Sequence, residues 1–300
     1  MTTTHEPPRG DVLASLNFYS PPEDGSAPFN LAGDVPPGLP PRNYGSIPKD
    51  VLIQDARGQE STFTLDKDAF QILLDQPPSS ETAFTDDASI QTNYYPEVEH
   101  LLLTTVPGAT KIIIFDHTVR RTTPNAPRQP VARVHIDQTA LSTRQRIRRH
   151  ATTSPSEADT LLSSPSSRYR IINVWRPLNT SPVESFPLAF ASSSTLRDRD
   201  VVPVEHRYPG GYVGQTAAIR HDPAQAWFYL SGMTGDERVL LECFDSAAAA
   251  AAALTGEEEG EWGEVKGGRV AHSAFEDPRT REGAEKRESI EVRALVFGPC

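Results

Sequence analysis

The chain has 300 residues, 37% of them hydrophobic and 23% charged, so it is long enough for one large domain or two small ones. Its formal net charge of −11 argues against nucleic-acid binding, because proteins that bind phosphate backbones usually carry a basic face. No apolar run reaches the length of a membrane span, and the N-terminus has no signal-peptide pattern. Two cysteines, Cys243 and Cys300, cannot form a disulfide framework. We therefore expect a soluble cytoplasmic protein with no membrane partner, and the oligomeric state stays open.

The N-terminal part of the chain is expected to be irregular and then helical. Residues 1–50 are rich in Pro and Gly and predict an arm that wraps the rest of the molecule. Residues 51–58 (VLIQDARG) predict a short strand that ends in a turn. The apolar spacing in residues 61–76 predicts an amphipathic helix that starts near Asp66, and residues 94–106 predict a second helix.

From residue 108 onward the pattern changes to short apolar segments bounded by Pro, Gly, Ser or Asp. The segments are KIIIFDHTVRR, PVARVHIDQT, YRIINVWRPL, AWFYLSGM, RVLLECFDS, GRVAHSAF and SIEVRALVF. This spacing is typical of an all-β barrel or jelly roll, and no glycine-rich nucleotide motif follows any segment. We predict a mainly β protein with flanking helices (α+β) that forms one domain over residues 1–300, with its β core at 108–297.

Two insertions interrupt the β series. Residues 139–163 contain RQRIRRH and SEADTLL, which predict helix after the segment VHIDQ. Residues 247–260 begin with seven alanines and continue into TGEEEG, which predicts a flexible surface insert with a helical start. Neither insertion suggests a binding site.

One motif, His135-x-Asp137, has the spacing of two metal ligands. In a strand, residues two apart point to the same side, so this pair gives two convergent ligands at a strand end. The chain has 8 histidines and 40 acidic residues, so about one such pair is expected by chance. The motif alone therefore also fits a surface histidine beside an aspartate.

A third ligand on a distant strand would complete a site for iron(II), which in oxygenases takes two imidazoles and one carboxylate on one face. His150 lies in a basic helical segment, and His206 and His221 lie in polar, turn-like segments. His272 lies in GGRVAHSAF, which is β-like and flanked by small residues. We predict His135, Asp137 and His272 as the metal ligands.

The strand after this histidine carries Arg287 and Ser289, two residues apart. A guanidinium fork with a hydroxyl beside it can hold the far carboxylate of 2-oxoglutarate. Arg287 could equally be a surface arginine beside Glu285 and Glu288. Arg293 has the same strand parity and competes for the carboxylate, binds a substrate acid or pairs with Glu291.

At these residues the chain resembles the AsaB/CmcJ-type oxygenases, which are gibberellin desaturase-like. The similar blocks are NYYPEVEHLL, IIIFDHTVRR, VHIDQT, NVWRPL, AWFYLSGMTGDERVLLECFDS, AHSAFEDP and RESIEVRALVF. They extend from about residue 11 to residue 297, with Ala271 where the family usually has Pro. The resemblance implies a double-stranded β-helix (jelly-roll, cupin-like) core and a secondary-metabolite dioxygenase. It also implies Fe(II), 2-oxoglutarate and O₂ as cofactor and co-substrates.

The expected reaction is oxidation of an unactivated C–H bond, by hydroxylation, desaturation or oxidative ring closure, on a small carboxylate-bearing molecule such as an amino acid. The predicted substrate-binding residues are Arg293, Arg176, Asn173, Trp175 and Arg120, and Tyr229 is a further candidate for binding 2-oxoglutarate. Trp175 and Tyr229 could instead be core residues, and Arg176 a loop anchor. The alternatives are a cupin-like iron oxidase that does not use 2-oxoglutarate and a non-catalytic partner of a biosynthetic enzyme.

Overall fold

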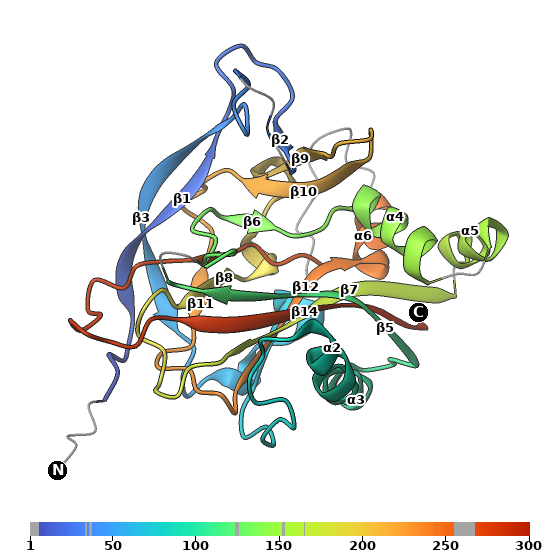
Figure 1. The fold of residues 1–300 in the computed structure, drawn as a ribbon. Helices are drawn as coiled ribbons and strands as arrows, with labels where there is room; N and C mark the ends of the chain where they lie inside the picture. The colour runs from blue at the N-terminus through green and yellow to red at the C-terminus, as the bar shows by residue number, and fades with distance from the viewer. Residues whose placement is uncertain are drawn as a thin grey trace.

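The computed structural model describes residues 6–33, 35, 38–123, 126–151, 154–164, 166–254 and 268–300. This part of the chain is mainly β with a few helices, which confirms the predicted fold class (Figure 1). The strands are β1 (Val12–Ser20), β2 (Phe29–Leu31), β3 (Gly45–Asp55), β4 (Phe70–Leu73), β5 (Lys111–Arg121), β6 (His135–Ile136), β7 (Ser167–Pro177), β8 (Leu188–Ala191), β9 (Val201–Arg207), β10 (Val213–Ile219), β11 (Trp227–Tyr229), β12 (Arg238–Asp245), β13 (His272–Ala274) and β14 (Glu288–Pro299). The helices are α1 (Leu65–Asp68), α2 (Asp87–Ser89), the π-helical turn η2 (Ile90–Tyr94), α3 (Tyr95–Thr105), α4 (Ala140–His150), α5 (Pro155–Ser163) and α6 (Ser246–Leu254), with short 3₁₀ turns at Glu60–Thr62, Ser193–Thr195 and Asp198–Asp200.

The strands form two sheets that face each other. The larger has the order β1-β3-β11-β8-β13-β6-β10-β9-β2 and the smaller β4-β12-β7-β14-β5, with antiparallel pairing except at β3–β11 and β2–β9. Trp175 of the smaller sheet packs in one apolar cluster with Phe190 and Phe228 of the larger sheet. Side chains of both inner faces therefore fill the space between the sheets.

Helix α3 covers the outer face of the five-stranded sheet (Figure 1). On β14, Ile290 and Val292 project outward and pack with Val98 and Leu102 of α3 in one cluster. The alternate residues of the same strand project inward, among them Glu291. In residues 289–293 the period of two thus gives this strand an apolar outer and a polar inner side, and beyond Arg293 both sides are apolar.

The N-terminal half departs from two expectations. Residues 1–50 are not only an arm, because β1 and β3 pair along nine positions and form one edge of the nine-stranded sheet. The helix expected in residues 61–76 is wrong beyond its first turn. Ala69 adopts a left-handed φ of 60°, which ends α1, and β4 then pairs with β12. The second expected helix is confirmed as α3.

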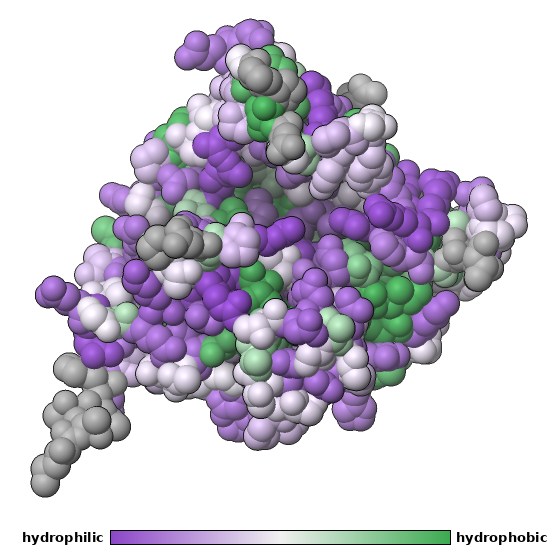
Figure 2. Space-filling view, viewed as in Figure 1, coloured by the Kyte–Doolittle hydropathy of each residue, from purple (hydrophilic) through white to green (hydrophobic). Residues whose placement is uncertain are grey.

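The two insertions are helical where the structure describes them. Residues 139–163 hold α4 and α5, and the alanine run forms α6, whereas residues 255–260 of the predicted insert lie outside the described residues. Within the described ranges, no helix is long and apolar enough to cross a membrane. The face shown in Figure 2 is mostly hydrophilic with smaller hydrophobic patches, as the mean hydropathy of −0.45 indicates.

Candidate active site

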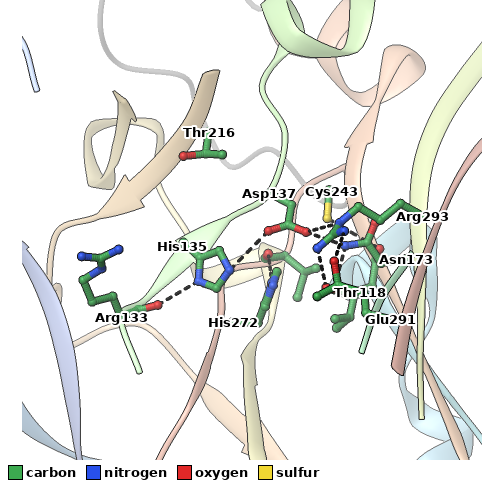
Figure 3. Close-up of polar contacts among 12 residues, drawn as sticks. Thr118, Arg133, His135, Asp137, Asn173, Thr216, Cys243, His272, Glu291 and Arg293 are labelled. Atoms are coloured by element: carbon green, nitrogen blue, oxygen red, sulfur yellow. Dashed lines mark hydrogen bonds and ion pairs between the residues drawn. The ribbon is translucent and has the colours of Figure 1, made fainter. Parts of the chain in front are cut away.

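Three side chains that can bind a metal ion meet between the two sheets. His135 begins β6, Asp137 follows that strand, and His272 begins β13. His135 lies directly opposite His272 in the antiparallel pair, so the two imidazoles share a face, with ring centroids 4.4 Å apart. One ligand atom from each of the three residues lies within 4.8 Å of the others (Figure 3). The geometry therefore assembles two imidazoles and one carboxylate.

Both histidines are held so that one ring nitrogen stays available. The Nδ1 atom of His135 donates to the carbonyl oxygen of Arg133 at 2.8 Å, and Nδ1 of His272 lies 3.3 Å from the carbonyl oxygen of Val270. Since a carbonyl only accepts hydrogen bonds, each Nδ1 carries the proton and each Nε2 keeps its lone pair. Burial, with the neighbouring His135, lowers the pKa of His272 to about 4. His272 is therefore neutral near pH 7, the form that binds metals.

The carboxylate of Asp137 is fixed by two donors on the five-stranded sheet. Its Oδ2 accepts from Nε of Arg293 at 2.8 Å and from Nδ2 of Asn173 at 3.0 Å. Burial alone would raise the pKa of Asp137, but Arg293 and His135 hold it well below its usual range. The carboxylate is thus ionised, and Oδ1 lies on the side of His135, 3.3 Å from its Nε2.

Arg293 is the centre of a buried polar network. Besides Asp137, its guanidinium donates to Asp116 at 3.0 Å, Thr118 at 3.1 Å and Glu291 at 2.7 Å (Figure 3). A bulge in the pairing of β14 with β5 follows directly after Arg293. Four of the five N–H groups of this arginine are therefore engaged by neighbouring side chains.

Arg287 has no ion pair with a carboxylate among the residues that the structure describes, although only 2% of it is exposed. Its Nη1 donates to the carbonyl oxygen of Phe186 at 2.6 Å, and its guanidinium carbon lies 5.6 Å from the ring centroid of Trp175. Its Nε is buried without a hydrogen-bond partner, and burial lowers its pKa to about 9. A narrow cavity joins Arg287 to His135 and His272. A buried guanidinium without an ion pair thus faces the metal-ligand cluster, while Glu291 in the same cavity wall is bound to Asn173 and Arg293.

A second cavity lies on the other side of His135, with a volume of about 180 Å³. His135, Asp137, Arg133, His206 and Arg120 lie in its wall, and Arg120 also lines the cavity of Arg287. Neither Arg120 nor Arg133 has an ion pair with a carboxylate among the described residues, and Arg120 donates only to the carbonyl oxygen of Gln129. This cavity is therefore basic apart from the metal-ligating aspartate.

The chain is similar along almost all of its length to proteins of known activity. It is 36% identical to the hydroxylase/desaturase poxK of Penicillium oxalicum, over 98% of this chain and 94% of the relative. It is 30% identical to the alpha-ketoglutarate-dependent dioxygenase phiK of a fungal species, over 97% and 98% of the two chains. The chain belongs to the Fe(II)/2-oxoglutarate-dependent oxygenases. The predicted family, enzyme class, iron and 2-oxoglutarate are thereby confirmed.

The structure and a family model agree with this assignment. The iron and alpha-ketoglutarate-dependent endoperoxidase NvfI superposes on the oxygenase with a TM-score of 0.80 at 26% identity, over 98% of this chain and 100% of that one. Residues 16–297 also match the family model described as "YDMC: Oxidoreductase/YMDC permease-like domain", so the chain belongs to that family too.

Two of the predicted substrate-binding residues of the oxygenase have a different role. Arg293 binds Asp137 and pairs with Glu291, the alternative that the sequence left open. Asn173 is fully buried and donates to Asp137 and Glu291. Because both side chains are engaged in holding the metal-ligating carboxylate, the prediction that they contact substrate is corrected.

Tyr229 does not lie at the site. Ser273 and Tyr229 both pair with Ala189, whereas His272 pairs with the next residue, Phe190. Directly paired residues share a face, so Tyr229 projects from the opposite face of the sheet. Its hydroxyl donates to the carbonyl oxygen of Gly10 at 2.7 Å. The prediction that Tyr229 binds 2-oxoglutarate is therefore corrected.

Arg176 also projects from the face of its sheet that points away from the metal ligands. It follows Trp175 on β7, so the two side chains project to opposite sides of the sheet. Its guanidinium carbon lies 5.3 Å and 5.6 Å from the ring centroids of Phe84 and Tyr94, on the side of α3. Arg176 thus cannot reach a substrate beside His135.

The sequence reasoning missed residues that the structure brings to the site. They are Asp116 and Thr118 in the network around Arg293, and Arg133 and His206 in the second cavity. A signal was present for the first group: polar residues alternate with apolar ones in FDHTVRR and ESIEVRALVF, so they share a face. His206 was set aside as turn-like but lies on β9.

Proposed function

We propose that the oxygenase binds Fe(II) through His135, Asp137 and His272, and holds the distal carboxylate of 2-oxoglutarate with Arg287 and Ser289. The observation that carries the proposal is the meeting of the three ligand atoms within 4.8 Å beside a buried arginine without an anion. Two neutral imidazoles and one carboxylate are the donor set of iron(II) oxygenases. Ser289, which is buried, has the strand parity of Arg287, and the carboxylate would bind at this edge of the cavity.

When bound, the metal supplies the oxidation chemistry by which 2-oxoglutarate and O₂ are consumed and succinate and CO₂ are formed. The chain's own residues position and enclose the reactants. Arg293 and Asn173 hold Asp137 through Oδ2, which leaves its other oxygen for the metal. Trp175 and Leu188 wall the cavity of Arg287 and keep water from it, which strengthens the charge interactions inside.

The proposed substrate is a small molecule with a carboxylate, such as an amino acid or its derivative. Arg120 and Arg133 in the wall of the second cavity support this, because neither has a carboxylate partner among the described residues. Of the arginines predicted to bind substrate, Arg120 is the one that would bind this carboxylate, in place of Arg293 and Arg176. The reaction on this substrate is hydroxylation, desaturation or ring closure, with formation of an aziridine as one form of ring closure.

The proposal includes the finer points of the fold. The two facing sheets form a double-stranded β-helix, and the chain is a single oxygenase domain that works in the cytoplasm. The likeness to NvfI and the shared apolar cluster between the sheets support this.

The decisive test is anaerobic titration of the purified chain with Fe(II) in the presence of 2-oxoglutarate, followed by calorimetry and the visible charge-transfer band. His135→Ala should weaken metal binding by roughly 100-fold or more, since one of three ligands is lost. The matched control is His206→Ala, which removes a histidine from the same cavity outside the ligand set. Equal iron affinity in both variants would refute the proposed ligands.

The substrate is tested by adding single amino acids to the iron-loaded enzyme in air and measuring succinate together with the mass of the product. Amino acids that fit should increase succinate release and gain an oxygen or lose two hydrogens. If no amino acid stimulates succinate release while the metal binds, the substrate proposal fails and the cofactor proposal stands.

A further inference from the structure

A third cavity lies outside the oxygenase site, between α3 and the outer face of the five-stranded sheet. Its volume is about 350 Å³, in the range of small-molecule sites. Arg238 from the start of β12 lines it together with Tyr94, Glu97 and His100. Because the sheet separates this cavity from the metal ligands, it belongs to neither cavity described above.

Two buried guanidinium groups lie close together here: that of Arg238, which lines the cavity, and that of Arg176 beside it. Val239 lies opposite Trp175 in the pairing of β12 with β7, so the register brings Arg238 beside Arg176. Nη1 of Arg238 and Nη2 of Arg176 donate to the same carbonyl oxygen, that of Gly235, at 2.7 Å and 2.8 Å. Only 4% of Arg238 and 8% of Arg176 are exposed. Two like charges are therefore held close together in a poorly solvated place.

Neither arginine has an ion pair with a carboxylate in the described part of the chain. Among the described residues, Nε and Nη1 of Arg176 are buried without a partner in good hydrogen-bond geometry, and the hydroxyl of Tyr94 lies beside both guanidinium groups. Arg176 gains some stabilisation from the faces of Phe84 and Tyr94, but aromatic faces do not satisfy N–H donors in the plane of the guanidinium. Buried donors of this kind are normally satisfied by a partner.

The other charges around the cavity do not neutralise the pair. Glu97 is turned toward Ser80, whose N–H and hydroxyl both donate to its Oε1 at 2.7 Å. Asp236 lies on an exposed turn, and its Oδ1 accepts from the hydroxyl of Thr234. His100 on α3 is exposed and adds no negative charge. Glu97 and Asp236 thus act on the two arginines only from beyond ion-pair distance.

Tyr94 reaches this place through an unusual backbone. It ends the π-helical turn η2 between α2 and α3, and 1% of it is exposed. Such turns are rare and occur frequently at functional sites. The turn gives the cavity a hydroxyl donor beside the two guanidinium groups.

We propose that this cavity binds a small oxoanion, the carboxylate or phosphate group of a metabolite, between Arg176, Arg238 and Tyr94. An oxoanion supplies the acceptors that these donors lack and the negative charge that the arginine pair lacks. The planar fork of a guanidinium matches both groups.

The test is calorimetric titration of the full chain with inorganic phosphate and with malonate, at constant ionic strength set with chloride. The Arg287→Gln background removes the active-site arginine from the measurement. In this background we expect binding to persist and to weaken roughly tenfold or more in Arg238→Gln, because a charged hydrogen bond to the anion is lost. Tyr94→Phe should weaken it by a smaller factor.

Glu97→Gln is the matched variant in which the affinity for the anion should rise instead of fall. It removes a negative charge from the cavity wall and keeps an acceptor for Ser80. It should bind the anion a few-fold more tightly. Preference for phosphate or for malonate identifies the group. Absence of binding of either anion at millimolar concentration overturns the proposal. So does unchanged affinity in folded Arg238→Gln. If Arg238→Gln does not fold, unchanged affinity in Glu97→Gln overturns it.

Discussion

Both faces of the five-stranded sheet are buried and largely apolar, but only the inner face carries the polar groups around the metal ligands. On the outer face, Ile290 and Val292 of β14 pack against Leu102 of α3. On the inner face, Glu291 and Arg293 of the same strand lie in the network that holds Asp137. A sheet with one buried face normally turns its apolar side inward. Here the outer face supplies packing energy and the inner face positions the reactive groups.

The inner face also carries two buried arginines that differ in their partners. Arg293 is surrounded by Asp137, Glu291 and Asp116 and forms an ion pair with each of them. Arg287 lies on the same face without an acidic partner in the described structure. A buried charge is costly unless it is paired. We therefore expect the paired Arg293 to hold the metal-ligating carboxylate in place and the unpaired Arg287 to bind an anionic ligand.

The largest expected effect lies on the outer face. Leu102 is fully buried against the sheet, so Leu102→Ala should lower the free energy of unfolding by about 2–5 kcal/mol through lost contacts and a cavity. Urea unfolding followed by circular dichroism measures this. The folded variant should keep the iron affinity of the wild type, since no metal ligand contacts the helix.

Leu103→Ala is the control for Leu102→Ala. Leu103 is 39% exposed, so its removal should change the free energy of unfolding by no more than about 0.5 kcal/mol. A loss of iron affinity in folded Leu102→Ala would contradict the separation of the two faces.

The division between the faces could be predicted from the sequence only in part. The period of two in β5, β7 and β14 is visible in the letters and predicts these strands, and the spacing of two predicts that His135 and Asp137 share a side. The four-residue β8 and β9 with its Pro203 carry too little periodicity to be seen. In residues 61–76 the apolar spacing fits both a helix and a strand. The left-handed φ of Ala69 ends the helix, and residues 70–73 continue as a strand.

A smaller effect is expected for the unpaired arginine of the inner face. Arg287→Gln should raise the KM for 2-oxoglutarate roughly 30- to 100-fold, because a charge-assisted hydrogen bond to the carboxylate is lost. Succinate formation at varied 2-oxoglutarate concentration measures it. Stability should fall little, because the wild-type guanidinium is already unpaired.

Arg121→Gln is the matched variant on the opposite face of the neighbouring strand. Arg121 pairs with Glu288 at 2.8 Å, and both side chains are partly exposed. Its loss should leave the KM for 2-oxoglutarate unchanged, and an equal rise in both variants would mean that Arg287 acts only through general charge.

The site shows the same limit of sequence reasoning. The positions of His135, Asp137 and His272 follow from strand parity and β-like context, and the structure brings them together. The roles of Arg293 and Arg176 do not follow from their positions in the sequence. Which carboxylate an arginine meets depends on strands that are distant in sequence, such as β5 beside β14. Strand parity alone places the neighbouring side chains of Trp175 and Arg176 on opposite faces of the sheet.

The last effect is small per unit of pH and concerns a buried carboxylate on the outer face. Glu242 of β12 lies opposite Ile172, is 0% exposed, and its Oε1 has no hydrogen-bond partner. Its nearest cation is Arg170, whose Nη1 lies 3.7 Å from that oxygen. Burial and, after it, Asp245 raise the pKa of Glu242 to about 8, against which Arg170 acts only in part. Because the folded pKa lies above the unfolded value of 4.5, the proton is bound more tightly in the folded protein.

The contribution of Glu242 to stability is therefore complete below the unfolded pKa and is lost as the pH rises toward about 8. Glu242→Gln resembles the protonated acid and lacks this dependence. Between these limits the wild type should lose stability relative to the variant by up to about 1.4 kcal/mol per pH unit. Urea unfolding of both proteins across the range measures the difference, with Asp159→Asn on the exposed face of α5 as the control that should run parallel to the wild type. If the stability of Glu242→Gln instead follows the same pH dependence as that of the wild type, the outer face tolerates an ionised carboxylate at position 242. The two faces would then differ only in how their arginines are paired.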